Sequence, residues 1–238
     1  GITGITLAWL LARQGRQVTL LEAHEIGSGS TGNSTGNLYV TLSHGFHDLQ
    51  SRWGTDVARQ VVGQRSAAID FIEEQSRDAP GAAFRRCALV QYAMGSEQQG
   101  QMDREYEALS AAGVKVERQQ RMQGPLPPAA GPARVLPGQA QFQPQAYLVH
   151  LAQEARRAGA SIHEHSRVIE IDMKKRWVDT ATGSVTAREI VMATHTPKGI
   201  RLVHGEMPVY REYAVALPLH DAAHDPGPGI FWAQGAEG

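Results

Sequence analysis

The sequence predicts an α/β protein in which a nucleotide-binding domain is interrupted by an inserted domain. Gly1-Ile2-Thr3-Gly4 leads directly into an apolar helical segment, and the short β-rich run after it ends at Glu22. Beyond an inserted middle region, the chain returns to a helix and several short strands from Pro144 onward. The first segment has the spacing of the second half of a G-x-G-x-x-G turn, with an acidic residue about 20 positions further on. This combination predicts a Rossmann-like domain that binds a dinucleotide and whose first strand is missing from this chain.

The first domain begins with a helix, a strand and a glycine-rich segment. Residues 3–14 place apolar side chains mostly on one helical stripe, and Gly15 ends the predicted helix. Residues 17–21 form a short run of the kind that is buried in a parallel sheet. The segment 27–37 contains almost no hydrophobic side chains, and such a stretch is often a flexible linker. Because apolar segments flank it on both sides, we expect instead a loop whose backbone N–H groups surround a ligand.

A long helix, a strand and a second helix are predicted in the middle of the chain. Helical periodicity covers residues 48–77, with Trp53 among the positions expected to be buried. Residues 85–94 alternate as a strand does. Residues 96–112 form a polar helix, with Ser96 as the expected N-cap.

The last part of the chain is predicted to be a loop, a helix and a group of short strands. Residues 124–138 contain five prolines among small residues, which indicates a loop. Pro144 then opens a helix that continues to Ala158. Short strands are expected near Ile162 and at residues 168–173, 177–179 and 190–193, with a hairpin turn at residues 174–176 and a further turn at Gly183-Ser184.

The order of these elements predicts two domains, one of them discontinuous. We assign residues 1–45 and 144–203 to the dinucleotide-binding domain. Residues 46–143 and 204–238 are assigned to an inserted α+β domain, built on a mixed or antiparallel sheet and expected to bind the substrate.

Composition argues against several other classes of site. A net charge of −1 gives no electrostatic indication of a nucleic-acid partner. Cys87 is the single cysteine, which leaves no disulfide framework and no cysteine metal site. His163 and His165 alternate on a strand without a third ligand at suitable spacing, so we predict no metal site. No apolar run approaches the ~18 residues of a membrane span, and we expect a cytoplasmic protein.

Four segments, in their order and spacing, resemble the flavin-dependent amine and amino-acid oxidoreductases of the D-amino acid oxidase, glycine oxidase and sarcosine oxidase type. Residues 1–4 with Leu20-Leu21-Glu22-Ala23 are similar to the FAD fingerprint of that family, and residues 27–38 are similar to its flavin loop. Residues 141–144 resemble its entry to a helix, and residues 190–195 resemble a strand that passes under the cofactor. The tail of the chain is most similar to the branch that contains gamma-glutamylputrescine oxidases.

The resemblance implies FAD as the cofactor. It implies non-covalent binding, because Asn33 stands where some relatives carry a flavin-linked histidine. Glu22 would accept hydrogen bonds from the ribose hydroxyls and would repel a 2′-phosphate, which favours FAD or NAD over NADP. The implied cofactor-binding residues are Gly1, Ile2, Thr3, Gly4, Glu22, Ala23, Ser30, Thr31, Asn33, Ser34, Asn37, Leu38, Val168, Ala193 and Thr194.

The resemblance also implies a reaction. An amino acid or small amine would be oxidised at its C–N bond by hydride transfer to the flavin, the imine would be hydrolysed, and dioxygen or a quinone would reoxidise the flavin. The flavin carries this chemistry and no acid–base triad is needed, so the catalytic residue is unknown. The candidates are His44, Arg211 and Tyr213.

Two other functions stay open at this point. Residues 29–43 also resemble the FAD domain of an enzyme that modifies the wobble uridine of tRNA, although such an enzyme would need a basic face. The resemblance further implies that segments at both ends are absent, so this fragment alone is expected to lack part of its active site. A non-catalytic remnant is therefore the third hypothesis.

Overall fold

A computed structural model describes residues 1–43, 45–120, 131–195 and 227–234, together with positions 213, 215, 217, 218 and 225. These residues form two compact units. Unit 1 comprises Gly1–Thr35 and the described part of Gln143–Ala214, and unit 2 comprises Gly36–Phe142 and the described part of Val215–Gly238. Residues 36–45, which the sequence assigned to the dinucleotide-binding domain, fall in unit 2 because their strand pairs there. The assignment of the two units to cofactor and substrate stays a prediction.

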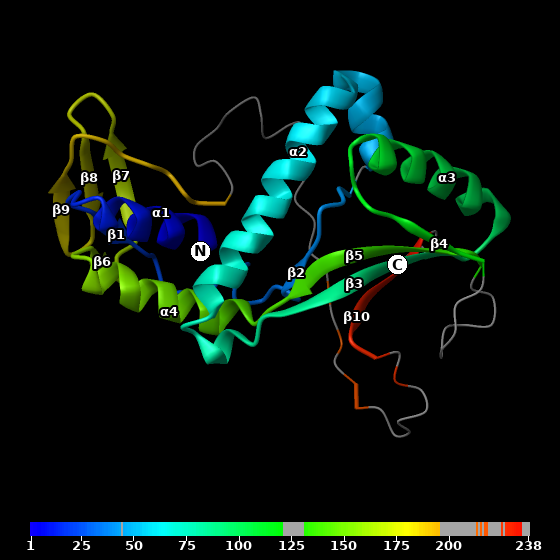
Figure 1. The fold of residues 1–238 in the computed structure, drawn as a ribbon. Coiled ribbons are helices and arrows are strands. Elements are labelled where there is room, and N and C mark those ends of the chain that lie inside the picture. The colour runs from blue at the N-terminus through cyan, green and yellow to red at the C-terminus, as the bar shows by residue number, and fades with distance from the viewer. Residues whose placement is uncertain are drawn as a thin grey trace. The chain divides into compact units, whose positions relative to one another are not determined.

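Unit 1 contains two packed helices, a parallel strand pair and a small antiparallel sheet (Figure 1). Helix α1 packs on α4, and both helices bury small and aliphatic side chains. β1 and β6 are parallel, and β7–β9 form an antiparallel sheet with β8 in the centre. The elements are α1 (Ile2–Arg13), β1 (Thr19–Leu21), α4 (Pro144–Arg157), β6 (Ser161–His163), β7 (Val168–Asp172), β8 (Trp177–Thr180) and β9 (Gly183–Thr186).

Three helices end as their glycines predict. Gly15, Gly113 and Gly159 follow α1, α3 (Ser96–Ala111) and α4, and all three have positive φ angles. In each case the glycine N–H and the next N–H bond back to the last turn, as in Arg16 N to Leu11 O at 3.1 Å. This is the Schellman arrangement, which a residue with a Cβ adopts only with strain.

Two predictions about the end of unit 1 are wrong. Residues 190–193 have no regular structure and pair with no strand in the described part of the chain, although a β-rich run predicted one. A strand requires a partner as well as propensity. Gly183-Ser184 begins β9 instead of forming a turn, because its neighbours 181–182 make the reversal. The predicted hairpin turn at 174–176 is confirmed, and the N–H groups of Lys174 and Lys175 bond to Asp172 Oδ1.

Unit 2 is built on a mixed five-stranded sheet, which confirms the predicted fold class. The strand order is β10-β3-β5-β2. β4 also pairs with β5, along the first residues of that strand, whereas β2 pairs with its last two residues. β10 is parallel to β3, and the other pairs are antiparallel. The elements are β2 (Asn37–Leu38), α2 (Phe46–Ser76), the 3-10 turn Pro80–Ala82, β3 (Arg85–Ala93), α3, β4 (Glu117–Gln119), β5 (Ala133–Gln141) and β10 (Gly229–Gln234).

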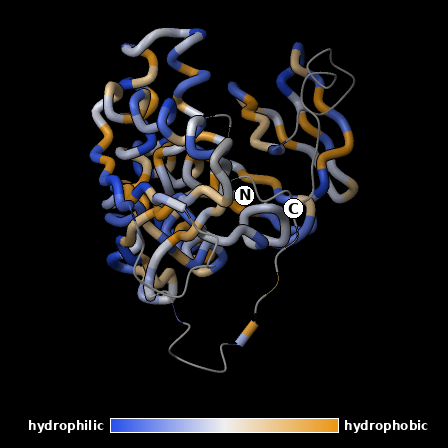
Figure 2. Tube along the Cα trace, turned by 90° about the vertical axis from the view of Figure 1, so that its right-hand side faces the viewer, coloured by the Kyte–Doolittle hydropathy of each residue, from blue (hydrophilic) through white to orange (hydrophobic). Residues whose placement is uncertain are grey.

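Helices α2 and α3 cover one face of this sheet. Ile69 from α2 and Leu109 from α3 share a buried cluster with Leu89 and Leu136 of the two central strands. A second cluster around Val90 occupies the opposite face. Figure 2 shows hydrophilic and hydrophobic residues interspersed along the trace. No described helix is long and apolar enough to cross a membrane.

The start of α2 differs from the prediction. Gly54 has φ 83° and ψ 166°, so the helix changes direction there, near its N-terminal end (Figure 1). Trp53 lies beside this break and is 68% exposed, not buried. The prediction assumed one continuous helical periodicity, and the break at Gly54 interrupts it. For α3, the N-cap is Gly95 instead of the predicted Ser96.

The predicted loop at 124–138 is wrong in its second half, because β5 begins at Ala133. Pro137 and Gly138 of β5 oppose the single residue Ala88 of β3 between the pairs Cys87–Gln139 and Leu89–Leu136, so β5 contains a bulge. Gly138 in the bulge has φ 75°, and the missing N–H of Pro137 is tolerated at such a position. The signals that indicated a loop therefore mark an irregular strand.

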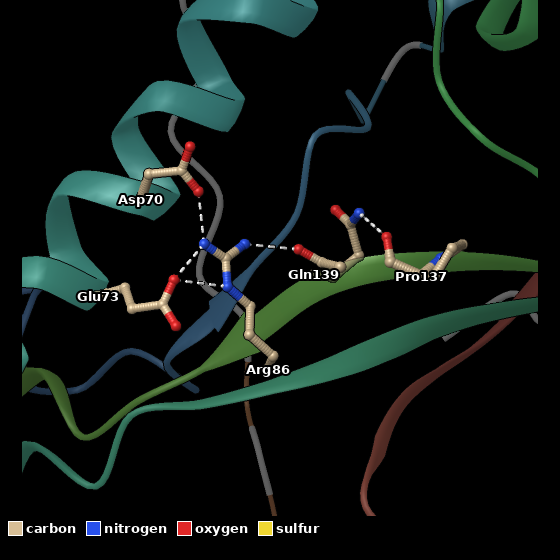
Figure 3. Close-up of polar contacts among 6 residues, drawn as sticks. Asp70, Glu73, Arg86, Pro137 and Gln139 are labelled. Atoms are coloured by element: carbon tan, nitrogen blue, oxygen red, sulfur yellow. Dashed lines mark hydrogen bonds and ion pairs between the residues drawn. The ribbon is translucent and has the colours of Figure 1, made fainter.

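Polar side chains bind the carbonyl groups of this bulge (Figure 3). Arg86 donates to Gly138 O at 2.8 Å, and its other nitrogens bond to Glu73 at 2.9 Å and Asp70 at 2.5 Å on α2. Gln139 donates to Pro137 O at 2.9 Å. Arg86 therefore links α2 to the bulge of β5.

We predict that Glu105→Ala destabilises unit 2 by about 1–2 kcal/mol. Glu105 of α3 accepts hydrogen bonds from Phe46 N at 2.7 Å and His47 N at 2.9 Å, and α2 has no side-chain cap from its own N-cap residue. Urea denaturation measures the loss, and Glu107→Ala on an exposed position of α3 is the matched control. Equal stability of the two variants would contradict the cap.

We also predict a contribution of Tyr147 to alkaline unfolding. Burial raises the pKa of Tyr147 to about 12 from 10. Above pH 10 the unfolded chain releases this proton while the folded chain keeps it, so stability falls as pH rises through that window. The slope from this residue is about 1.4 kcal/mol per pH unit. We expect the free energy of unfolding to fall less between pH 9 and pH 11 in Tyr147→Phe than in wild type, as measured by denaturation at both pH values. An identical fall in the two proteins would exclude this contribution.

Candidate functional site

The N-terminus of α1 is arranged to face an anion. The helix has no side-chain cap of its own and no acidic residue in its first turn. Its Ile2 N–H donates instead to Thr31 Oγ1 at 3.2 Å, from the glycine-rich loop. The unpaired N–H groups of a helix start carry partial positive charge, and they attract phosphate groups.

Gly4 lets the helix approach its neighbours closely. A Cβ at Gly4 would lie 3.3 Å from Ala193 Cβ and 4.0 Å from Leu20 Cδ1 of β1. This is the role of the third glycine in a dinucleotide-binding turn, where helix and strand pack tightly. The structure therefore brings together Gly4 and Ala193, two of the predicted cofactor residues that are far apart in sequence.

Glu22 lies directly after β1, beside the start of α1. Its N–H bonds to His163 O at 2.9 Å, which extends the parallel ladder by one residue. One carboxylate oxygen accepts from His24 N at 3.1 Å, and the other lies 3.9 Å from the Gly1 nitrogen. The side chain is 24% exposed, so it remains accessible to a ligand hydroxyl.

The loop after β1 is anchored at Ile26 by two side chains from distant elements. Glu164 Oε1 accepts from Ile26 N at 2.7 Å, and Gln145 Nε2 donates to Ile26 O at 3.0 Å. Both backbone groups of this buried residue are thereby satisfied. The start of the loop has a defined position, unlike the start of a flexible linker.

Two glycines of the loop close around the amide of Gln145. A Cβ at Gly27 would lie 1.7 Å from Gln145 Oε1, and a Cβ at Gly32 would lie 1.9 Å from Gly27 O and 2.6 Å from the same Gln145 oxygen. In contrast, a Cβ at Gly29 would meet nothing within 4 Å. Sequence reasoning missed Gln145, because a polar residue in the first turn of a helix gives no sign of such a contact.

The Gln145 oxygen itself is buried and has no hydrogen-bond partner in the described structure. The start of α1, Thr31 of the glycine loop and Glu22 lie beside one another. These features suit a dinucleotide with a pyrophosphate and ribose hydroxyls, so the residues present fit FAD.

The remaining predicted residues lie in several places. Asn33 Nδ2 donates to Gly29 O at 3.0 Å within the loop. Asn37 and Leu38 form β2 of unit 2, where Asn37 Oδ1 accepts from Gln141 at 2.9 Å. Val168 is the first residue of β7 and is partly exposed. The roles of these residues, and of Ser30, Ser34, Ala23 and Thr194, stay predictions.

Of the three catalytic candidates, the structure describes Tyr213. His44 and Arg211 lie outside the described residues. The Tyr213 side chain is 86% exposed. In the described part of the chain, no group of three His, Cys, Asp or Glu side chains is placed to hold a metal ion.

Comparison with curated proteins gives three relatives. The chain is 28% identical over 227 residues to the protein of Bacillus subtilis named "Putative Rieske 2Fe-2S iron-sulfur protein YhfW", covering 91% of this chain and 43% of the relative. It is 27% identical over 206 residues to gamma-glutamylputrescine oxidoreductase of Escherichia coli, covering 81% and 46%. The match to the tRNA 5-methylaminomethyl-2-thiouridine biosynthesis bifunctional protein MnmC of Nitrosospira multiformis has 31% identity over 98 residues, covering 41% and 14%. The chain spans less than half the length of each relative.

Among solved structures, glycine oxidase from Geobacillus kaustophilus superposes with a TM-score of 0.66 at 22% identity, covering 81% of this chain and 52% of that one. This similarity confirms the predicted fold. The family described as "DAO: FAD dependent oxidoreductase" matches residues 1–238. That match confirms FAD as the cofactor class, and the chain belongs to the DAO family of FAD-dependent oxidoreductases.

Proposed function

We propose that this protein oxidises the C–N bond of an amino acid or small amine with FAD as the hydride acceptor. The observation that carries the proposal is the match of the whole chain to the DAO family, combined with a helix start, a close-packed glycine and an acidic residue in the geometry of a dinucleotide site. The similarity to gamma-glutamylputrescine oxidoreductase supports an amine as substrate.

In this proposal the α1 N-terminus holds the pyrophosphate of FAD. The N–H group of Thr3 would face the phosphate oxygens. Because Thr31 Oγ1 accepts from Ile2 N, its own hydroxyl hydrogen can donate to the same phosphate. Glu22 would accept from the adenosine ribose, and its negative charge would disfavour the 2′-phosphate of NADP.

The other residues of unit 1 would shape the rest of the cofactor site. The backbone of Val168 would contact the adenine, and Ala193 and Thr194 would line the cofactor. The loop closed by Gly27 and Gly32 would offer N–H donors. Bound non-covalently, FAD supplies the hydride chemistry, and dioxygen or a quinone would reoxidise it. The protein would bind the amine without its proton and orient the C–H bond.

The direct test is anaerobic reduction of the FAD-loaded protein by a panel of D-amino acids, glycine, N-methyl amino acids and polyamine derivatives. We expect one class of amine to bleach the flavin absorbance, which would also identify the substrate class. A flavin-containing protein that no amine reduces would contradict the proposal and favour the tRNA-modifying alternative. A preparation that binds no flavin would favour a non-catalytic protein.

We predict that Gly32→Ala weakens FAD binding by at least about tenfold, equivalent to about 1.4 kcal/mol. The added Cβ would collide with Gly27 O and displace the loop that contains Thr31. Gly29→Ala is the matched control in the same loop, since its Cβ would meet open space. Equilibrium titration of the apoprotein with FAD, followed by flavin fluorescence, gives both dissociation constants. Equal affinities would show that the loop does not contact the cofactor.

A further inference from the structure

Two arginines face each other at one end of the unit 2 sheet. Arg118 of β4 and Arg134 of β5 are direct partners across the antiparallel ladder. Like charges at such positions repel each other and destabilise the pair unless an anion lies between them. One carboxylate does so: Asp103 Oδ1 of α3 is 3.1 Å from Arg118 Nη2 and 3.2 Å from Arg134 Nη2.

Asp103 is the carboxylate that contacts both guanidinium groups in the described structure. The other neighbouring acid, Glu105, bonds to the N–H groups of Phe46 and His47 at the start of α2 and not to either arginine. The ring of Tyr106 lies under both guanidinium groups, with centroid distances of 4.3 Å to Arg118 and 5.6 Å to Arg134. This stacking holds the two groups in place, but it adds no negative charge.

Burial makes the unused hydrogen-bond donors of Arg134 costly. The Arg134 side chain is only 5% exposed, whereas that of Arg118 is 51% exposed. Desolvation lowers the pKa of Arg134 to about 10, against the opposing effect of Asp103. A guanidinium has five N–H donors, and in the described structure Arg134 donates one hydrogen bond, to Asp103.

A small cavity of about 80 Å³ adjoins the pair. Its lining includes Gln99, Gln119 and Gln120 in addition to the charged residues. Met102 contributes an apolar wall. The cavity therefore combines two cations, amide donors and an apolar contact in a space that holds a few heavy atoms.

We propose that this cavity binds a small carboxylate through Arg118 and Arg134. A planar carboxylate matches the fork of a guanidinium, and it would accept hydrogen bonds from the N–H groups of Arg134 that Asp103 does not use. The amides of the three glutamines would complete its hydrogen bonding, and a short aliphatic tail would contact Met102. This site is independent of the proposed amine oxidation, because it uses none of the residues assigned to FAD.

The test is titration of the FAD-loaded protein with ¹³C-labelled acetate at constant ionic strength, followed by NMR line broadening. We expect saturable binding by wild type that chloride does not reproduce. Arg118→Gln removes one of the two cations but keeps the Asp103–Arg134 pair, and it should weaken acetate binding by about tenfold or more. Arg104→Gln, at an exposed position on α3, is the control and should bind as wild type does.

Asp103→Asn supplies the opposite change. It removes the carboxylate that competes for the two guanidinium groups and should tighten acetate binding, and circular dichroism checks that this variant is folded. Absence of saturable binding by wild type, equal competition by chloride, or unchanged affinity in Arg118→Gln would each overturn the proposal. The flavin absorbance of every variant shows whether the FAD site is intact, so failure of this site is distinguishable from failure of the proposed function.

Discussion

The arrangement of unit 1 depends on the insertion of the Gln145 amide between two glycines. No side chain at position 27 or 32 leaves room for that amide, and the amide in turn fixes Ile26, where the loop begins. The same loop contains Thr31, whose hydroxyl accepts from the first N–H of α1. Helix α4, the loop and the start of α1 are therefore linked in series, and a cofactor at the helix start would depend on all three.

Unit 2 uses a similar principle, in which side chains bond to irregular backbone. Arg86 of the neighbouring strand β3 and Gln139 of β5 itself bind the carbonyls of the bulge in β5 (Figure 3). Glu105 of α3 accepts from the first N–H groups of α2. Buried backbone groups that lack regular partners are expensive to leave unpaired. These long-range hydrogen bonds therefore allow a bulged strand and a bent helix to belong to one packed unit.

Local signals in the sequence were sufficient for most of the helices and for the dinucleotide motif. Gly15, Gly113 and Gly159 each end a helix by a bonding pattern that involves only neighbouring residues, and Gly4 with Glu22 has a fixed spacing. The failures involve partners that are remote in sequence. Pro137 and Gly138 indicated a loop because nothing local shows that β3 will pair with the residues on both sides of them. Gln145 gave no signal, since its role exists only where the loop folds against α4. Residues 190–193 have β propensity, but they pair with no strand in the described structure.

The central claim is that the start of α1, Glu22 and the glycine loop together hold FAD. A crystal structure of the protein with FAD bound tests this most directly. The account predicts the pyrophosphate at the start of α1, where it accepts from the N–H of Thr3 and the hydroxyl of Thr31, and the adenosine ribose on the Glu22 carboxylate. An adenosine bound elsewhere, with Glu22 making no contact to the ribose, would contradict it.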